Sequence, residues 1–345
     1  MTLHQEIFEQ PTVLSNLLAN QLSAVQAIAE QISARDIQYV FLAARGTSDN
    51  AGRYANYLWG SLNRWPIALA TPSLFTLYRQ PPALKGALVV GVSQSGQSPD
   101  IVSVLAEGRR QGSPTLAITN EPDSPLAQTA DYVIDIQAGV EKAVAATKTY
   151  TAELMAIAML AVSLKVDAER RRSLDHVSAW VQQMLAQDER IKQLAQRYRF
   201  MEQCVVLGRG YNYSTAFEWS LKLKELAYVG AEPYSSADFQ HGPIAIVEHG
   251  FPVMAVIPAG PVFDSLLSLL RRLRRDQSAE LLVISDRPDA LSLAQSAIPL
   301  PPDVPEWLTP IVSIVPAQLF TYHLTVAKDF DPETPRIIHK VTETK

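Results

Sequence analysis

The sequence predicts an α/β fold built from two similar halves, each a parallel sheet flanked by helices. Short apolar runs alternate with helical patterns along the chain, and this rhythm is typical of parallel strands covered on both faces. The pattern also restarts, because Arg45-Gly46 follows one predicted strand and Arg209-Gly210 follows another. We interpret the restart as a duplication of one α/β unit, with the break around residues 165–200.

The first half begins with a predicted helix over residues 11–34, whose apolar residues recur with a helical period. Further helices are predicted up to residue 62, from residue 99 onward and over residues 148–164. The predicted strands of this half cover residues 37–44, 67–70, 87–92, 115–119 and 132–136.

The second half follows one long, charged, amphipathic helix predicted over residues 168–199. Its predicted strands cover residues 204–208, 252–258 and 280–286, and its helices cover 214–228 and 315–328. A basic run at residues 271–275 lies on a further predicted helix and indicates a solvated face. We place the first domain at 1–165, the connecting helix at 166–199, the second domain at 200–330 and a C-terminal tail at 331–345.

The composition excludes several classes of protein. A formal charge of −5 over 345 residues argues against nucleic-acid binding, which needs a basic face. The single cysteine, Cys204, permits no disulfide framework, and no apolar run reaches membrane-spanning length. No spacing of His, Cys and Asp predicts a metal site, so we expect no metal and no cofactor. We expect a cytoplasmic protein that binds neither nucleic acid nor membrane.

A polar turn follows the strand at residues 87–92. Its side-chain donors are Ser93, Gln94, Ser95 and Ser98, and Pro99 then begins a helix. Free N–H groups and the positive end of the helix dipole make such a turn an anion site, and neutral donors suit the phosphate of a small polar molecule. The alternative is an ordinary turn between a strand and a helix that uses serine for capping.

The second half carries a charged stripe and a loop histidine. Glu218, Lys222 and Glu225 share one helix face at i, i+4 and i+7. The stripe is either a solvated face or, because Leu221, Leu223 and Leu226 flank it, the wall of a cleft in which a carboxylate accepts protons. His241 precedes Gly-Pro on a loop and has the pKa range needed to open a sugar ring, although a loop histidine is often a plain surface residue.

Together these motifs resemble the sugar isomerase (SIS) domain pair, most closely the isomerase half of glutamine–fructose-6-phosphate aminotransferase. The resemblance rests on residues 45–48, 93–96, 146–148, 221–225, 241–243 and Lys340. It implies two tandem SIS domains, each a flavodoxin-like three-layer α/β/α sandwich. It also implies a sugar-phosphate substrate and a homodimer with shared active sites.

The resemblance implies a role for each matching residue. Ser93, Gln94, Ser95 and Ser98 would hold the phosphate, Thr47 and Ser48 would help to bind the sugar, and the backbone around Val144 would touch the open chain. Glu225 would move a proton between C1 and C2, and His241, donated by the partner subunit, would assist ring opening. Lys222 would lie near the sugar hydroxyls, Lys340 near the reacting carbonyl or imine, and Glu218 near the ring-opening group.

The chain departs from the aminotransferase pattern at several points. Arg45 and Ala146 stand where that family carries Cys and Ser, and His339 replaces a small residue beside Lys340. The sequence also lacks the N-terminal cysteine of a glutamine-hydrolysing domain, so we expect no ammonia from glutamine. The resulting hypothesis is a stand-alone phosphosugar isomerase that converts glucosamine 6-phosphate into fructose 6-phosphate and ammonia. The alternatives are a fructosamine-6-phosphate deglycase and a non-catalytic sugar-phosphate sensor.

Overall fold

The structure is a computed structural model that describes residues 2–165, 167–338 and 340. Contacts within the chain divide it into two compact units. The first-sheet unit comprises residues 9–142, 146–178 and residue 340, and the second-sheet unit comprises residues 2–8, 143–145 and 179–338. Each unit contains one five-stranded parallel sheet, which confirms the predicted α/β class.

The first sheet has the strand order β2-β1-β3-β4-β5. Its order reverses between β1 and β3, as in flavodoxin-like sheets. All five strands coincide with predicted strands: β1 (Tyr39–Ala43), β2 (Ile67–Leu69), β3 (Ala87–Val92), β4 (Thr115–Thr119) and β5 (Tyr132–Asp135).

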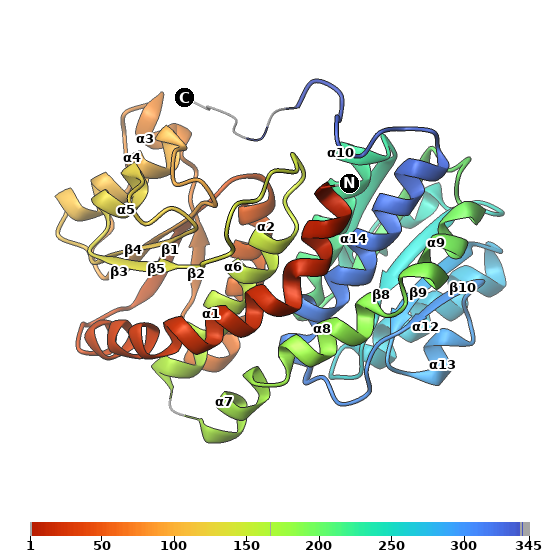
Figure 1. Ribbon diagram of the computed structural model, residues 1–345, viewed down its shortest axis with the longest axis horizontal. Helices are drawn as coiled ribbons and strands as arrows, with labels where there is room; N and C mark the ends of the chain where they lie inside the picture. The colour runs from red at the N-terminus through yellow and green to blue at the C-terminus, as the bar shows by residue number, and fades with distance from the viewer. Residues whose placement is uncertain (1, 166, 339, 341–345) are drawn as a thin grey trace. The chain divides into compact units, whose positions relative to one another are not determined.

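Helices cover both faces of the first sheet and give the three predicted layers (Figure 1). On one face, Leu105 of α4 (Pro99–Arg110) and Leu126 of α5 (Pro125–Thr129) share a core with Val89. On the other face α2 approaches the sheet closely, because a Cβ on Gly52 would lie 2.6 Å from Leu42 Cδ2. The remaining elements are α2 (Gly46–Leu58), a π-helical turn (Trp59–Asn63), α3 (Ser73–Thr76) and α6 (Lys148–Leu164).

The second sheet repeats this topology in the order β10-β9-β8-β6-β7, so its order reverses between β6 and β8. The repeated topology supports the predicted duplication. The strands are β6 (Gln203–Gly208), β7 (Gly230–Ser235), β8 (Pro252–Val256), β9 (Glu280–Ser285) and β10 (Ser296–Pro299). The sequence did not predict β7 and β10, which are edge strands that contain Pro233 and Pro299.

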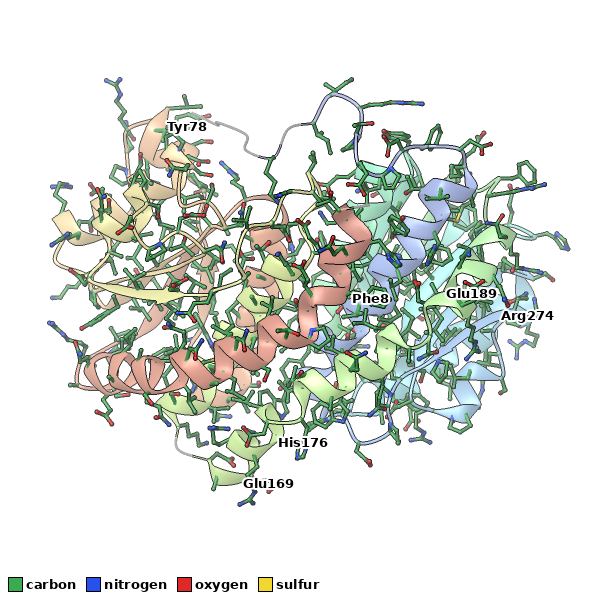
Figure 2. All side chains as sticks on the ribbon, in the orientation of Figure 1. Phe8, Tyr78, Glu169, His176, Glu189 and Arg274 are labelled. Carbon is green, nitrogen blue, oxygen red and sulfur yellow. The ribbon has the colours of Figure 1, made fainter. Side chains whose placement is uncertain are left out.

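The helices of the second-sheet unit place the remaining motifs. They are α10 (Tyr213–Leu226), α11 (Ser236–Phe239), α12 (Phe263–Asp276), α13 (Pro288–Leu291) and α14 (Thr309–Ala327), with 3₁₀ turns at Gly210–Asn212, Pro243–Ile246 and Glu306–Leu308. Arg271, Arg274 and Arg275 of α12 are exposed, as the predicted solvated face requires. Figure 2 labels Arg274 among them. The expectation that no apolar run reaches membrane-spanning length is wrong for Glu306–Ala327, which is long and apolar enough by length and composition. In this structure, however, 89% of its apolar window is buried, as in the core helix of a folded domain.

The prediction of a single long helix over residues 168–199 is wrong. The described part of this stretch forms α7 (Ala168–Leu174), α8 (Val177–Leu185) and α9 (Asp188–Arg197). The first two helices end in 3₁₀-type backbone hydrogen bonds. Asp175 N donates to Arg172 O at 3.1 Å, and Gln187 N donates to Met184 O at 3.1 Å. Asp188 then begins α9, where a carboxylate is favoured by the helix dipole. The opening helix also differs, because α1 (Thr2–Ser33) starts nine residues before the predicted start and passes through Pro11.

Candidate functional site

Two predicted binding turns lie side by side in the first-sheet unit. Residues 45–48 follow β1 and residues 93–98 follow β3, and these strands are hydrogen-bonded neighbours. Arg45 Nε donates to Asp100 Oδ2 at 2.8 Å and so joins the two turns. They occupy the carboxyl edge of the sheet where the strand order reverses, which is the usual ligand position in such folds.

The backbone of the serine turn depends on Gly96. Its φ is +59°, and a Cβ there would lie 2.0 Å from Ser124 Oγ. The Gly96 N–H donates to Ser93 Oγ at 3.2 Å, which tightens the turn. Ser98 and Pro99 then start α4 as predicted, but the Ser98 hydroxyl makes no capping bond to the helix.

The serine turn can accept an anion. Among the described atoms, none accepts a hydrogen bond from the backbone N–H of Ser95 or of Ser98, and both residues are half-buried. These N–H groups lie at the positive end of α4. The nearby carboxylate of Asp100 is 1% exposed, and its charge is balanced by Arg45. The turn therefore offers neutral donors, and the buried carboxylate of Asp100 near them is paired with a cation.

The sugar-binding candidates Thr47 and Ser48 stand at the start of α2. Thr47 is half-buried, whereas Ser48 is buried and donates from Oγ to Glu153 Oε1 at 2.7 Å. Glu153 lies on α6 and is itself buried. Sequence reasoning missed this carboxylate because it lies within a strongly apolar helix. The pair fixes the hydroxyl of Ser48 at the edge of the predicted sugar site.

The charged stripe of α10 is not a solvated face. Lys222 is 2% exposed and Glu218 is fully buried. Lys222 Nζ lies 2.5 Å from Glu225 Oε2 and 3.4 Å from Glu218 Oε1. Burial alone would lower the pKa of Lys222, but the two carboxylates outweigh it and raise the pKa above its ordinary value. Glu225 keeps a 24% exposed side chain, so its carboxylate reaches solvent while it pairs with a cation.

The tail lysine is held by a carboxylate that the sequence reasoning missed. Lys340 Nζ lies 2.6 Å from Glu141 Oε2 within the first-sheet unit. The buried Glu141 side chain also accepts from Thr147 N and Thr149 Oγ1, each at 2.8 Å. An acidic residue shortly before a predicted helix is the signal that could have found it. His339 lies outside the described residues.

His241 and Val144 lie in the second-sheet unit. His241 is exposed just beyond α11, and no hydrogen bond or ion pair joins its ring to the rest of the described chain. An exposed ring is compatible with a role toward a second subunit. Val144 is half-buried, and its neighbour Ala143 donates from N to Glu6 Oε2 at 3.2 Å, which orders the backbone there.

The equivalent turns of the second sheet are filled by the protein itself. A Cβ on Gly260, in the loop after β8, would lie 2.4 Å from the carboxyl carbon of Glu306. A Cβ on Gly210, after β6, would lie 3.7 Å from Glu306 Oε1. Burial raises the pKa of Glu306. The Glu306 side chain thus packs against both of these turns.

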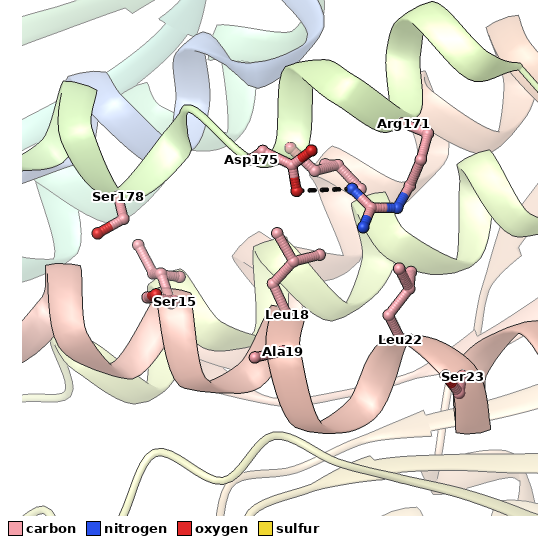
Figure 3. Close-up of a pocket in the computed structure, with 10 residues that line it drawn as sticks. Ser15, Leu18, Ala19, Leu22, Ser23, Arg171, Asp175 and Ser178 are labelled. Carbon is pink, nitrogen blue, oxygen red and sulfur yellow. Dashed lines mark hydrogen bonds and ion pairs between the residues drawn. The ribbon is translucent and has the colours of Figure 1, made fainter.

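A separate hollow of about 300 Å³ lies in the first-sheet unit between α1 and the α7–α8 segment (Figure 3). Its lining includes Leu18, Leu22 and the ion pair between Arg171 and Asp175, whose atoms are 2.7 Å apart. The charges of this pair cancel, and none of the predicted site residues lines the hollow. We assign it no part in the reaction.

Comparison with known proteins identifies relatives along nearly the whole chain. The family model of the SIS domain matches residues 35–163 and 201–328. The glutamine–fructose-6-phosphate aminotransferase of Thermosynechococcus vestitus is 34% identical over 366 residues, which cover 97% of this chain and 58% of that protein. The enzyme of the same name from Thermus thermophilus is 33% identical, with coverages of 97% and 58%. The chain thus spans somewhat more than half the length of these curated relatives.

Solved structures agree with this result. The C-terminal domain of glucosamine-fructose-6-phosphate aminotransferase from Francisella tularensis matches with a TM-score of 0.87 and 30% identity, over 97% of this chain and 98% of that one. The glucosamine-6-phosphate deaminase of Thermotoga maritima matches with a TM-score of 0.78 and 18% identity, over 100% of both chains. At that identity, the second likeness establishes a shared fold.

Proposed function

Because the chain belongs to the SIS domain family, we propose that it is a phosphosugar isomerase that converts glucosamine 6-phosphate into fructose 6-phosphate and ammonia. The observation that carries the proposal is the ion-paired, partly exposed carboxylate of Glu225 beside the buried Lys222. A carboxylate that reaches solvent is the kind of group that moves a proton between neighbouring carbons. The names of the aminotransferase relatives point to a six-carbon sugar phosphate.

The phosphate end of the substrate would bind at the serine turn. Ser93, Gln94, Ser95 and Ser98 supply neutral donors at the start of α4, and the Arg45–Asp100 pair balances the one buried carboxylate beside them. Thr47 and Ser48, at the neighbouring strand end, would bind sugar hydroxyls. Ser48 is oriented for this by Glu153.

The reaction needs no change of oxidation state overall. Ring opening exposes an aldehyde at C1, and Glu225 then takes the proton from C2 and returns it to C1. The product is an imine at C2, which water hydrolyses to the ketone with release of ammonia. Lys222 would contact sugar hydroxyls while it pairs with Glu225, and the buried Glu218 would keep Lys222 in place.

The remaining roles concern ring opening and the tail. Exposed His241 would open the ring in the active site of a partner subunit, which makes a homodimer part of the proposal. Lys340, held by Glu141, would face the carbonyl or imine, so that the tail 331–345 completes the site. The backbone at Val144 would contact the open chain. We propose a cytoplasmic location for this activity on a soluble metabolite.

The test is ammonia release by the purified chain from a panel of aminosugar and fructosamine 6-phosphates. Release from glucosamine 6-phosphate, with fructose 6-phosphate in equal amount, is the expected result. Release from a fructosamine 6-phosphate alone would identify a deglycase instead. Stabilisation of the chain by these compounds without any turnover would identify a sensor.

The role of Glu225 is tested by Glu225→Gln, with the exposed Glu232→Gln as the matched control. General acid–base groups contribute about 10²–10⁴-fold, so we expect a loss of that size in kcat for Glu225→Gln and none for Glu232→Gln. Phosphate binding, followed by the thermal shift with inorganic phosphate, stays unchanged in both variants. Full activity in Glu225→Gln would remove this residue from the mechanism.

A further inference from the structure

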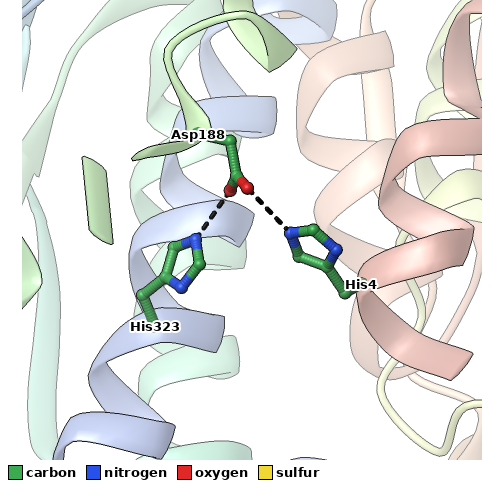
Figure 4. A group of neighbouring side chains, drawn as sticks. All are labelled: His4, Asp188 and His323. Atoms are coloured by element: carbon green, nitrogen blue, oxygen red, sulfur yellow. Dashed lines mark hydrogen bonds and ion pairs between the residues drawn. The ribbon is translucent and has the colours of Figure 1, made fainter. Parts of the chain in front are cut away.

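Two histidines and an aspartate from three different helices converge in the second-sheet unit (Figure 4). His4 of α1 donates from Nε2 to Asp188 Oδ2 at 3.1 Å. His323 of α14 donates from Nε2 to Asp188 Oδ1 at 2.6 Å. One carboxylate at the start of α9 thus serves two imidazoles, and the potential ligand atoms all lie within 4.8 Å of one another.

The surroundings of this cluster are partly closed. The His323 side chain is 9% exposed, whereas Asp188 and His4 are 24% and 30% exposed, so a solvated ion can enter from one side. The rings of Phe8 and Tyr322 pack on His4 with centroids 4.7 and 4.8 Å away. These aromatic contacts limit the orientation of the His4 ring.

We propose that His4, Asp188 and His323 form a binding site for a divalent transition-metal ion of the zinc type, with water as the fourth ligand. Imidazole nitrogens and a carboxylate are ligands that zinc commonly takes in proteins. Bonds of about 2.0–2.1 Å to a tetrahedral ion bring ligand atoms to about 3.3 Å apart. The two imidazole–carboxylate pairs, now 2.6 and 3.1 Å apart, would widen slightly, and larger separations, which reach at most 4.8 Å, would close.

The protonation of the two rings matters for binding. Metal binding requires a neutral imidazole with a free lone pair on the nitrogen that faces the ion. The charged or titratable groups near His323 are Asp188, His4 and Lys192. Both rings donate from Nε2 in this structure, so binding through Nε2 requires each neutral ring to change tautomer and carry its single proton at Nδ1.

The proposed ion would fasten the first turn of α1 to α9 and α14. These helices are far apart in the sequence, so a bound ion would link distant parts of the chain. For the same reason, the spacing of His and Asp in the sequence does not predict the site. The site shares no residue with the proposed isomerase site, and the consequence we expect from it is for stability. Zinc that binds only the folded chain stabilises it by RT ln(1 + [Zn]/Kd), so the unfolding temperature rises with the logarithm of the free zinc concentration.

The test is to treat the full chain with a chelator, remove the chelator and measure zinc binding by equilibrium dialysis against zinc chloride. We expect one zinc per chain and an increase in unfolding temperature that excess chelator reverses. His4→Gln and Asp188→Asn each weaken zinc binding at least tenfold. The exposed His249, in the same unit, provides the control variant His249→Gln, which binds zinc as the unchanged chain does.

Cobalt provides a second readout, because its absorption spectrum reports nitrogen and oxygen ligands directly. We expect a visible band in the cobalt-loaded chain that is absent in His4→Gln. The His4 side chain is 30% exposed, so we expect His4→Gln to fold. It remains informative even if His323→Gln, at a more buried position, does not fold. Zinc binding that is absent, or that His4→Gln and Asp188→Asn leave unchanged, overturns the proposal.

Discussion

Lys222 Nζ lies 2.5 Å from Glu225 Oε2 on α10, and Lys222 is almost completely buried. A second carboxylate, that of the fully buried Glu218, lies 3.4 Å from the same nitrogen. One ammonium therefore balances a buried acid on one side and a partly exposed acid on the other. The arrangement pairs a partly exposed carboxylate with a buried ammonium, and it makes Lys222 a structural residue as well as a candidate catalytic one.

Replacing Lys222 by methionine should destabilise the fold strongly. Loss of one partner from a buried ion pair costs about 3–5 kcal/mol, because the remaining charge has no counterion. Lys224 lies on the same helix but is exposed, and Lys224→Met should change the free energy of unfolding by less than about 0.5 kcal/mol. Urea denaturation measures both values. Equal effects of the two substitutions would contradict the buried ion pair.

Glycine at position 96 should be needed both for stability and for phosphate binding. In Gly96→Ala the left-handed φ adds about 1–2 kcal/mol of strain, and the clash with Ser124 adds about 1–3 kcal/mol. Gly112 also has a positive φ, of +79°, but a Cβ there meets nothing within 4 Å, so Gly112→Ala should cost the strain alone.

The measurements for this pair are thermal unfolding with and without inorganic phosphate. The stabilising effect of phosphate should disappear in Gly96→Ala and persist in Gly112→Ala. If phosphate stabilises both variants equally, the anion binds elsewhere on the chain.

Much of the fold could be predicted because the strands of a parallel sheet are continuous apolar runs. Residues 115–119, for example, form β4 with the predicted bounds. The apolar helix predicted over residues 148–164 also has the bounds of α6. The edge strand β7 was missed because its proline and glycine are atypical of strands, which an edge position tolerates. The breaks between α7, α8 and α9 were missed because the amphipathic period continues across them.

The candidate site was predictable only in part, since sequence patterns report local relationships. Glu218, Lys222 and Glu225 were found because helical spacing puts them on one face. The partners Glu141 and Glu153 were not found, because only the fold brings them to Lys340 and Ser48. Nor could local spacing separate a solvated face from a buried stripe. Burial of Glu218 depends on packing around α10, which includes α14 from much later in the chain.

The stability of the chain should fall between pH 7 and pH 5 partly through His323. Burial lowers its pKa in the folded state below the ordinary value of about 6.5. The unfolded chain therefore binds the proton more tightly, and the contribution of His323 is fully present above about pH 6.5 and lost as the pH falls through the folded pKa. His323→Gln should flatten this part of the profile. Urea unfolding with chelator present measures the slopes, and identical slopes would contradict the prediction.

Arg45 should stabilise the serine turn by balancing Asp100. Asp100 is 1% exposed, so Arg45→Met leaves a buried carboxylate without its cation, although half of the arginine side chain reaches water and moderates the loss to about 1–3 kcal/mol. The uncompensated charge also repels phosphate, and we expect phosphate affinity to fall about tenfold, a change of about 1.4 kcal/mol. The double variant Arg45→Met with Asp100→Asn removes both charges and should recover most of the affinity. Calorimetric titration with glucosamine 6-phosphate measures it, and a double variant as weak as Arg45→Met would show that Arg45 binds the phosphate itself.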